Sequence, residues 1–354
     1  MTRSIPKNRR KRLFRRVIGL ILALVAVFTL DYHAYPYGSY ANAPSANRGE
    51  NGLWLRYTWY FGQKTPSETE SLAERLTQNQ IRYAYFHVRY IQKDGMLKYR
   101  FPKEAQALTS FLHQKAPDVK LVAYAYAAST KGEGPHVDIR QLAVRKHMSE
   151  EAAWLVNECG FDGVQWDYEI CSDGEPGYLQ LLEETRAALP KGALLSVATP
   201  VWYPFPLGRL GWSEDFFTQV ARRCDQVAVM VYDSGFCTPR SYAWLAHQEA
   251  VHVTTAVARS KTHCRVLLGI PTYGRGFPSH NPRAERIAIA IKGVREGIAD
   301  STAHPEVFAG IAPFADYTTD GTEWAEFQRL WLNQGASANV RHTEPDRDSA
   351  SDGH

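Results

Sequence analysis

The sequence predicts an α/β chain folded as a (β/α)8 TIM barrel, and three observations support that prediction. Apolar runs typical of strands alternate with helical patterns eight times between residues 52 and 332. This stretch has the length of one large domain, and eight is the number of units at which such a barrel closes. No G-x-G-x-x-G motif follows the first apolar run, which argues against the alternative, a doubly wound dinucleotide-binding sheet.

The expected strands are apolar and rich in aromatic or β-branched residues. They cover residues 52–61, 81–90, 119–127, 161–169, 193–199, 226–233, 265–273 and 307–317. The expected helices carry apolar residues at three- and four-residue spacing, over residues 66–78, 102–115, 140–159, 177–189, 213–223, 239–260, 283–299 and 320–332. Asp320 followed by Glu323 predicts a capping box at the start of the last helix.

Both ends of the chain lie outside the expected barrel. Residues 1–16 form a basic segment expected in the cytoplasm, and residues 17–30 are an apolar run expected to be a signal peptide or signal anchor. Fourteen helical residues span only about 21 Å of a hydrocarbon core about 30 Å thick, which favours a cleaved signal. Ala41-Asn42-Ala43 has the small-x-small pattern of a cleavage site, but Pro44 directly after it argues against cleavage, so both outcomes stay open. Residues 31–51 are expected to be a linker, residues 333–354 a disordered tail, and the protein to be exported, either secreted or membrane-anchored.

The net charge of +4 originates in the N-terminal segment. Eight of the 41 basic residues lie within residues 1–30, so the remainder carries 33 basic residues against 37 acidic ones. A mildly acidic domain without a basic stripe is not expected to bind nucleic acid. The five cysteines show no C-x-x-C spacing, so no metal site or cofactor is expected, and their odd number leaves at least one thiol outside any disulfide.

Residues 160–169, GFDGVQWDYE, carry the strongest chemical signal. Because side chains alternate along a strand, Gln165, Asp167 and Glu169 are expected to share one face. Two carboxylates on one buried face are costly unless they are paired or hydrogen-bonded. The pattern therefore predicts either acid/base chemistry or a structural ion pair.

The working groups of such a barrel lie at the carboxyl ends of its strands. The expected end residues are Tyr57 and Trp59; His87 and Arg89; Tyr124 and Tyr126; Asp167 and Glu169; Met230, Tyr232 and Asp233; Tyr273 and Arg275; and Phe314, Asp316 and Tyr317. A mouth lined by acids and aromatic rings suits a carbohydrate, and two cations are too few for a phosphate clamp.

Three motifs in this sequence resemble glycoside hydrolase family 18, the chitinase family. The fourth strand of that family ends in D-G-x-D-x-D-x-E, its sixth carries M-x-Y-D, and its seventh often ends in G-x-P-x-Y-G-R. The matching residues here are Asp162, Gly163, Asp167 and Glu169, with Gln165 at one Asp position; Met230, Tyr232 and Asp233; and Gly269, Pro271, Tyr273, Gly274 and Arg275.

The resemblance implies retaining, substrate-assisted hydrolysis of β-linked N-acetylglucosamine glycans, such as chitin oligomers, peptidoglycan or the N-glycan core. It implies that Glu169 protonates the glycosidic oxygen while Asp167 orients the attacking acetamido group of the substrate. It also implies that Tyr232 hydrogen-bonds the acetamido carbonyl. The residues expected to bind substrate are Gln165, Met230, Asp233, Tyr273, Arg275, Trp59 and Phe314.

The sequence departs from that family at three places. Gln165 replaces an aspartate; its amide can hydrogen-bond Asp167 but cannot carry a negative charge, so a changed pH profile or lower activity is expected. The third strand ends in AYAYAAS where many members have S-x-G-G. The tryptophan that forms the floor of the sugar site in that family is missing from the eighth strand, where Phe314 is the nearest aromatic residue. Two alternatives therefore stay open, a non-catalytic carbohydrate-binding barrel and a hydrolase of sugars lacking the acetamido group, with Asp167 as nucleophile. The expected partners are a carbohydrate polymer or oligosaccharide and, if the N-terminal segment is uncleaved, a membrane.

Overall fold

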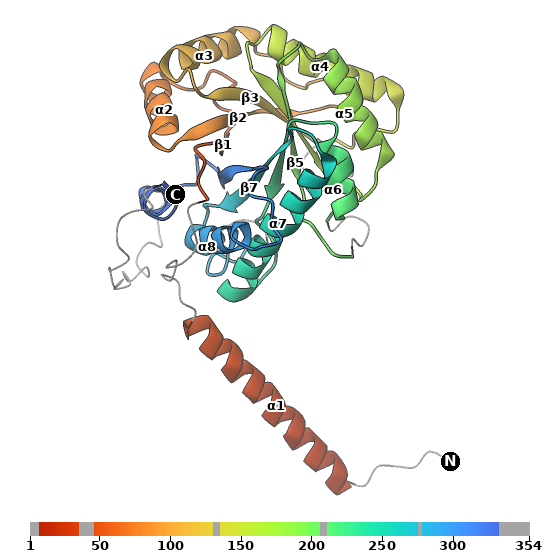
Figure 1. The fold of residues 1–354 in the computed structure, drawn as a ribbon, viewed down its shortest axis with the longest axis vertical. Coiled ribbons are helices and arrows are strands. Elements are labelled where there is room, and N and C mark those ends of the chain that lie inside the picture. The colour runs from red at the N-terminus through yellow and green to blue at the C-terminus, as the bar shows by residue number, and fades with distance from the viewer. Residues whose placement is uncertain (1–6, 35–45, 130–134, 206–210, 275–277, 333–354) are drawn as a thin grey trace.

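The computed structural model describes residues 7–34, 46–129, 135–205, 211–274 and 278–332. Eight parallel strands, paired in chain order, curl into a nearly closed barrel inside a ring of helices (Figure 1). The strands are β1 (Asn51–Leu55), β2 (Ile81–Tyr90), β3 (Lys120–Ala128), β4 (Gly163–Glu169), β5 (Leu194–Thr199), β6 (Gln226–Met230), β7 (Arg265–Pro271) and β8 (Phe308–Phe314). The predicted (β/α)8 fold class is confirmed.

The first and last strands meet through Asn51, whose side chain is fully buried. Its Oδ1 accepts hydrogen bonds from the Ile311 N–H at 3.3 Å and from the Trp331 indole N–H at 2.8 Å. At the other end of the seam, the Asp316 N–H donates to the Trp54 carbonyl at 3.0 Å. These contacts bring the carboxyl ends of β8 and β1 together at the mouth.

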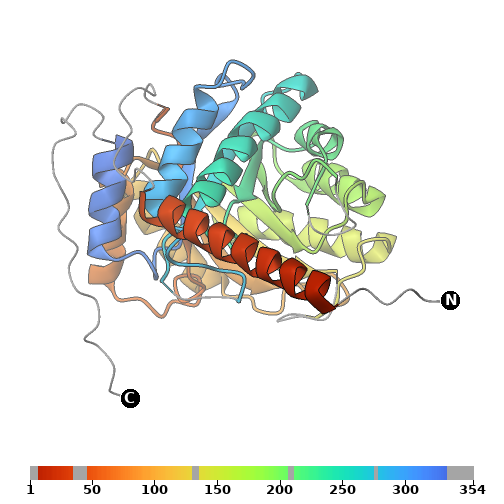
Figure 2. The same ribbon diagram turned by 90° about the horizontal axis from the view of Figure 1, so that it is seen from below.

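The surrounding helices follow the predicted ranges to within a few residues. They are α2 (Pro66–Gln78), α3 (Pro102–Lys115), α4 (Leu142–Asn157), α5 (Pro176–Ala188), α6 (Glu214–Ala221), α7 (Pro239–Ser260), α8 (Ile287–Ile298) and α9 (Gly321–Phe327), followed by the π-helical turn η1 (Gln328–Leu332). The predicted capping box of Asp320 and Glu323 is present at α9. Gln328 of η1 donates to Asn79, the residue after α2, at 3.1 Å, so the blue C-terminal helix closes the ring next to the orange α2 (Figures 1 and 2).

The predicted first strand, residues 52–61, is too long. Strand β1 ends at Leu55, and the residues after it form tight turns, in which the Phe61 N–H bonds the Tyr57 carbonyl at 3.0 Å. The aromatic run is buried by these turns instead of by a strand; Tyr60, for example, is fully buried and donates to the Tyr99 carbonyl. Strands β6, β7 and β8 also end two or three residues early, so Tyr232, Asp233, Tyr273 and Asp316 lie on the loops that follow them.

The N-terminal helix α1 (Lys7–Ala34) runs through both segments that the sequence analysis separated. At 28 residues it is about 42 Å long. The helix is therefore about twice as long as the 21 Å expected from residues 17–30 alone. Lys11–Leu30 is long and apolar enough to cross a membrane, and its side chains are exposed. Figure 1 shows α1 extending away from the barrel. Residues 31–34 belong to this helix instead of the predicted linker, and the predicted tail lies outside the described residues.

Strand β4 shows the predicted alternation. Trp166 and Tyr168 point outward, where they donate to the Thr185 hydroxyl at 3.1 Å and the Val137 carbonyl at 2.9 Å. Gln165, Asp167 and Glu169 point inward, each toward a side chain of a neighbouring or facing strand. The strand therefore presents both carboxylates to the barrel interior and its mouth.

Candidate active site

Two tyrosines of β3 hold the two carboxylates of β4. The Tyr124 hydroxyl donates to Asp167 Oδ2 at 2.7 Å, and the Tyr126 hydroxyl donates to Glu169 Oε2 at 3.1 Å. In the strand register Tyr124 lies beside Gln165 and Tyr126 beside Asp167, so each ring reaches two residues further toward the mouth. The arrangement orders a pair of acids at the carboxyl end of a barrel strand.

Asp167 is the more buried member, with 2% of its surface exposed. Burial raises the pKa of this carboxyl well above its usual range, the neighbouring Glu169 raises it further, and the Tyr124 hydrogen bond offsets part of the effect. Its second oxygen, Oδ1, is buried and has no hydrogen-bond partner among the described residues. A buried acceptor without a protein partner is uncommon, and here it is available to a ligand N–H.

Gln165 lies below this pair, and its side chain bonds residues other than Asp167. Its amide oxygen accepts from the Trp54 indole N–H at 2.8 Å, and its NH₂ donates to the Ser196 hydroxyl at 2.9 Å. Ser196 in turn donates to Gln226 at 2.8 Å. This neutral chain of bonds across the barrel interior uses both ends of the amide, which leaves none for Asp167.

Aromatic rings form the opposite side of the mouth. Tyr232 stacks on Phe314, with ring centroids 4.8 Å apart and planes at 23°. Edge contacts join Tyr232 to Trp54 at 6.4 Å and to Tyr273 at 6.3 Å. Burial raises the pKa of Tyr232 well above its usual range, so its hydroxyl stays protonated and can donate.

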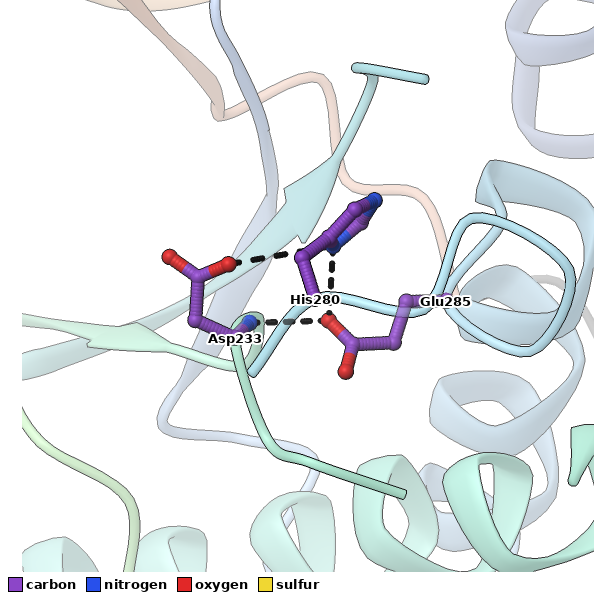
Figure 3. A group of neighbouring side chains, drawn as sticks. All are labelled: Asp233, His280 and Glu285. Carbon is purple, nitrogen blue, oxygen red and sulfur yellow. Dashed lines mark hydrogen bonds and ion pairs between the residues drawn. The ribbon is translucent and has the colours of Figure 1, made fainter. Parts of the chain in front are cut away.

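Asp233 follows Tyr232 with a left-handed backbone, φ 54°, and is fixed by a network on the loop after β7 (Figure 3). Its carboxylate accepts from the Tyr273 hydroxyl at 2.7 Å, and its N–H donates to Glu285 Oε2 at 2.8 Å. His280 Nδ1 lies 3.0 Å from Glu285 Oε2, and its Nε2 lies 2.9 Å from the Tyr273 carbonyl. Because a carbonyl only accepts, Nε2 carries the proton of that bond.

Asp233, His280 and Glu285 are also the group to test for a metal site. Their ligand atoms lie within 4.8 Å of one another, close enough to share a cation. The hydrogen bonds already occupy these atoms, since Glu285 accepts from the Asp233 N–H and from the Ser234 N–H and hydroxyl, and lies 3.0 Å from His280 Nδ1. A buried histidine between carboxylates accounts for the cluster without a metal ion.

The other predicted site residues are less central. Met230 is half-buried at the end of β6. Trp59 donates to Asp316 at 3.0 Å and lines a cleft at the seam of β8 and β1, together with Lys64 and Arg75. Arg275 lies outside the described residues.

Sequence reasoning named Tyr124 and Tyr126 as strand ends without giving them a role, and it missed Trp54, His280 and Glu285. The inward alternation of β1 was a usable signal for Trp54, since Leu53 and Leu55 face outward to the main core. His280 and Glu285 left no local signal, because their partner Asp233 lies 52 residues before Glu285.

A family model matches most of the chain. The model described as glycosyl hydrolases family 18 matches residues 56–337, which is most of the chain. No curated protein matches the chain in sequence.

Solved structures with the same fold include a spore enzyme, a domain of a putative chitinase and a chitinase. The Bacillus cereus spore cortex-lytic enzyme SleL is 14% identical with a TM-score of 0.57, over 82% of this chain and 75% of that one. The C-terminal domain of a putative chitinase from Desulfitobacterium hafniense DCB-2 is 16% identical with a TM-score of 0.57, over 82% of this chain and 99% of that one. A chitinase from Bacteroides thetaiotaomicron is 14% identical with a TM-score of 0.53, over 83% of this chain and 99% of that one.

Proposed function

The chain belongs to glycosyl hydrolase family 18 as a chitinase-like glycoside hydrolase, and from that premise we propose that it cleaves β-linked N-acetylglucosamine glycans with retention, by substrate-assisted catalysis. The observation that supports this most directly is Asp167 Oδ1, a buried acceptor without a protein partner that lies beside a second acid. An acetamido N–H of the substrate would supply the missing hydrogen bond. Chitin oligomers, peptidoglycan and the N-glycan core all carry that group.

In the proposed reaction Glu169 donates its proton to the glycosidic oxygen as the bond to the anomeric carbon breaks. The acetamido carbonyl oxygen attacks that carbon and forms an oxazolinium ion, whose positive charge Asp167 stabilises from the N–H side. Glu169 then takes a proton from a water molecule that opens the ring from the face of the departed group. Two inversions leave the original anomeric configuration.

The remaining residues shape the subsite around the acetamido sugar. Tyr232 donates to the acetamido carbonyl and holds it in line for attack. Asp233 and Tyr273, already bonded to each other at 2.7 Å, present polar atoms beside it. Phe314, stacked on Tyr232, offers an apolar floor to the sugar ring. We assign lesser roles to Met230, Trp59 and Arg275 as substrate contacts, and to Gln165 as the neutral support below Asp167.

The test is hydrolysis of N-acetylglucosamine oligomers by the full chain and by Glu169→Gln. We expect the β-anomer as the first product by proton NMR, and a loss of at least a hundredfold in kcat for the variant. An α-anomer as first product would contradict retention. Binding of these oligomers without any hydrolysis would instead favour the carbohydrate-binding barrel.

We propose in addition that α1 directs export of the barrel and keeps it attached to the membrane. A basic N-terminal end followed by an apolar helix that is able to cross a bilayer supports this. The barrel would then act on glycans outside the cytoplasm.

A further inference from the structure

We propose that Arg89 determines substrate choice by binding a carboxylate carried by the glycan, so that the site prefers acidic N-acetylated glycans to neutral ones. The inference rests on the proposed function for its substrate. It is carried by the backbone of Arg89, by the rings around its guanidinium group and by its position beside the catalytic pair.

Strand β2 is distorted where it presents Arg89. The regular pairing with β3 shifts between His87 and Arg89, and Arg89 has a left-handed backbone with φ 73°. Such a conformation is unfavourable for a residue with a side chain, and it persists where the surrounding structure imposes it. Bulges next to active sites commonly redirect one side chain, and this one redirects an arginine.

Two tyrosine rings fix the guanidinium group. Its central carbon lies 4.3 Å from the ring centroid of Tyr57 and 4.3 Å from that of Tyr90. Stacking holds the planar group while leaving its N–H edges available for a ligand. The guanidinium of Arg56 lies 5.5 Å from the same Tyr57 ring, so a second cation adds to the local positive potential.

No carboxylate pairs with Arg89 among the residues that the structure describes. Seven other described arginines of the barrel have an acidic partner: Arg100, Arg140, Arg145, Arg186, Arg223, Arg259 and Arg265. His87, two residues before Arg89 on the strand, adds no competing charge, because burial and then Arg89 lower its pKa to about 3. A half-buried arginine with free donor edges is suited to a planar carboxylate, which it can bind with two parallel hydrogen bonds.

Arg89 belongs to the same wall of the mouth as the proposed catalytic acid. The Tyr90 ring lies 5.7 Å from the Tyr126 ring, and the Tyr126 hydroxyl bonds Glu169. A glycan lying across Glu169 would therefore bring a neighbouring sugar toward Arg89. A single guanidinium stacked between rings matches one carboxylate per sugar better than a dianionic phosphate.

The test compares kcat/KM on a neutral N-acetylglucosamine oligomer with kcat/KM on a glycan strand in which alternate sugars carry a lactyl ether carboxylate. A third substrate is the same strand with its carboxylates converted to methyl amides. For the unaltered protein we expect the carboxylate strand to exceed the amide strand by about tenfold or more, as for a hydrogen bond to a charged group. We expect Arg89→Met to remove that ratio and Arg89→Lys to retain part of it.

Arg82→Met is the matched control, because Arg82 lies at the opposite end of β2 and bonds the Asp118 carbonyl. The ratio should not change in that variant. Equal rates on the carboxylate and amide strands, or a ratio that survives in Arg89→Met, would overturn the assignment of Arg89 while leaving the proposed hydrolysis intact.

Failure of hydrolysis on all three strands would count against the proposed function instead. Arg89 is then tested by binding alone. Calorimetry would give the affinities of the carboxylate and amide glycan strands for two proteins, the Glu169→Gln variant and the double variant Glu169→Gln, Arg89→Met. A preference for the carboxylate strand that disappears with Arg89 supports the site, and equal affinities overturn it.

Discussion

The indole N–H of Trp54 on β1 donates a 2.8 Å hydrogen bond across the barrel to the side-chain carbonyl of Gln165 on β4. The other end of the amide donates to Ser196, so Gln165 is used once as an acceptor and once as a donor. A carboxylate has no donor to offer Ser196 unless it is protonated. The amide at this position is therefore matched to its neighbours, although the family motif has an aspartate there.

Gln165→Glu should destabilise the fold at neutral pH by about 2–4 kcal/mol, because it places a carboxylate in a fully buried site and removes the donor to Ser196. Burial would raise the folded-state pKa of the new glutamate above its unfolded value of about 4.3. The penalty should thus be small below pH 4.3 and grow as the pH rises through the folded pKa. Urea unfolding at acidic and neutral pH measures it. Exposed Gln63→Glu is the control, and an equal loss in both variants would contradict the argument.

Tyr124→Phe should lower activity most strongly on the acid side of the pH profile. The Tyr124 hydroxyl stabilises the charged form of Asp167, so its removal favours the protonated form and raises the pKa of Asp167 further. Since the proposed reaction needs ionised Asp167, the acid limb of kcat/KM should move to higher pH, with about tenfold or more lost at the acid end.

Tyr85→Phe is the control for that profile, because Tyr85 is also a buried tyrosine and bonds Gln226 instead of an acid. Its acid limb should stay in place. A uniform loss at every pH in Tyr124→Phe would show that the hydroxyl acts only on packing.

The full chain should remain attached to membranes through α1 after alkaline carbonate extraction, at its uncleaved mass. Leu22→Arg combined with Leu24→Arg should release it or block its export, since each charge at the bilayer centre costs about 2.5–3.5 kcal/mol. Leu13→Arg, next to the basic end, should behave like the unaltered chain. A shorter mature protein in the soluble fraction would indicate a cleaved signal.

Which strand-end residues lie together could be predicted from the sequence. Asp167 and Glu169 were placed on one face because side chains alternate along any strand. Tyr232 and Phe314 were brought to the same mouth because parallel strands of a barrel all end there, and the two rings do stack. These predictions rest on periodicity and chain order, which a sequence carries directly.

Contacts that depend on loop conformation were not predictable. The aromatic run 57–61 has the composition of a strand, yet it forms turns that bury the same rings. Glu285 contacts Asp233 only because the loop after β7 folds back over the loop after β6. Neither the bulge before Arg89 nor this return of the chain has a local sequence signature.

Glu285→Gln should raise KM by roughly tenfold with a smaller effect on kcat, because Glu285 holds Asp233 from behind without reaching the proposed substrate. Glu285 is buried and accepts from the N–H groups of Asp233 and Ser234 at 2.8 and 3.1 Å, and an amide can offer an acceptor to one side only. The left-handed backbone of Asp233 would then relax and move its carboxylate away from Tyr273. Glu249→Gln is the matched control, since Glu249 is equally buried and accepts the Trp202 N–H at 2.8 Å on another part of the barrel. Both variants should lose stability by about 1–3 kcal/mol, so a rise in KM confined to Glu285→Gln would identify positioning of Asp233 as its cause, whereas equal KM values would refute it.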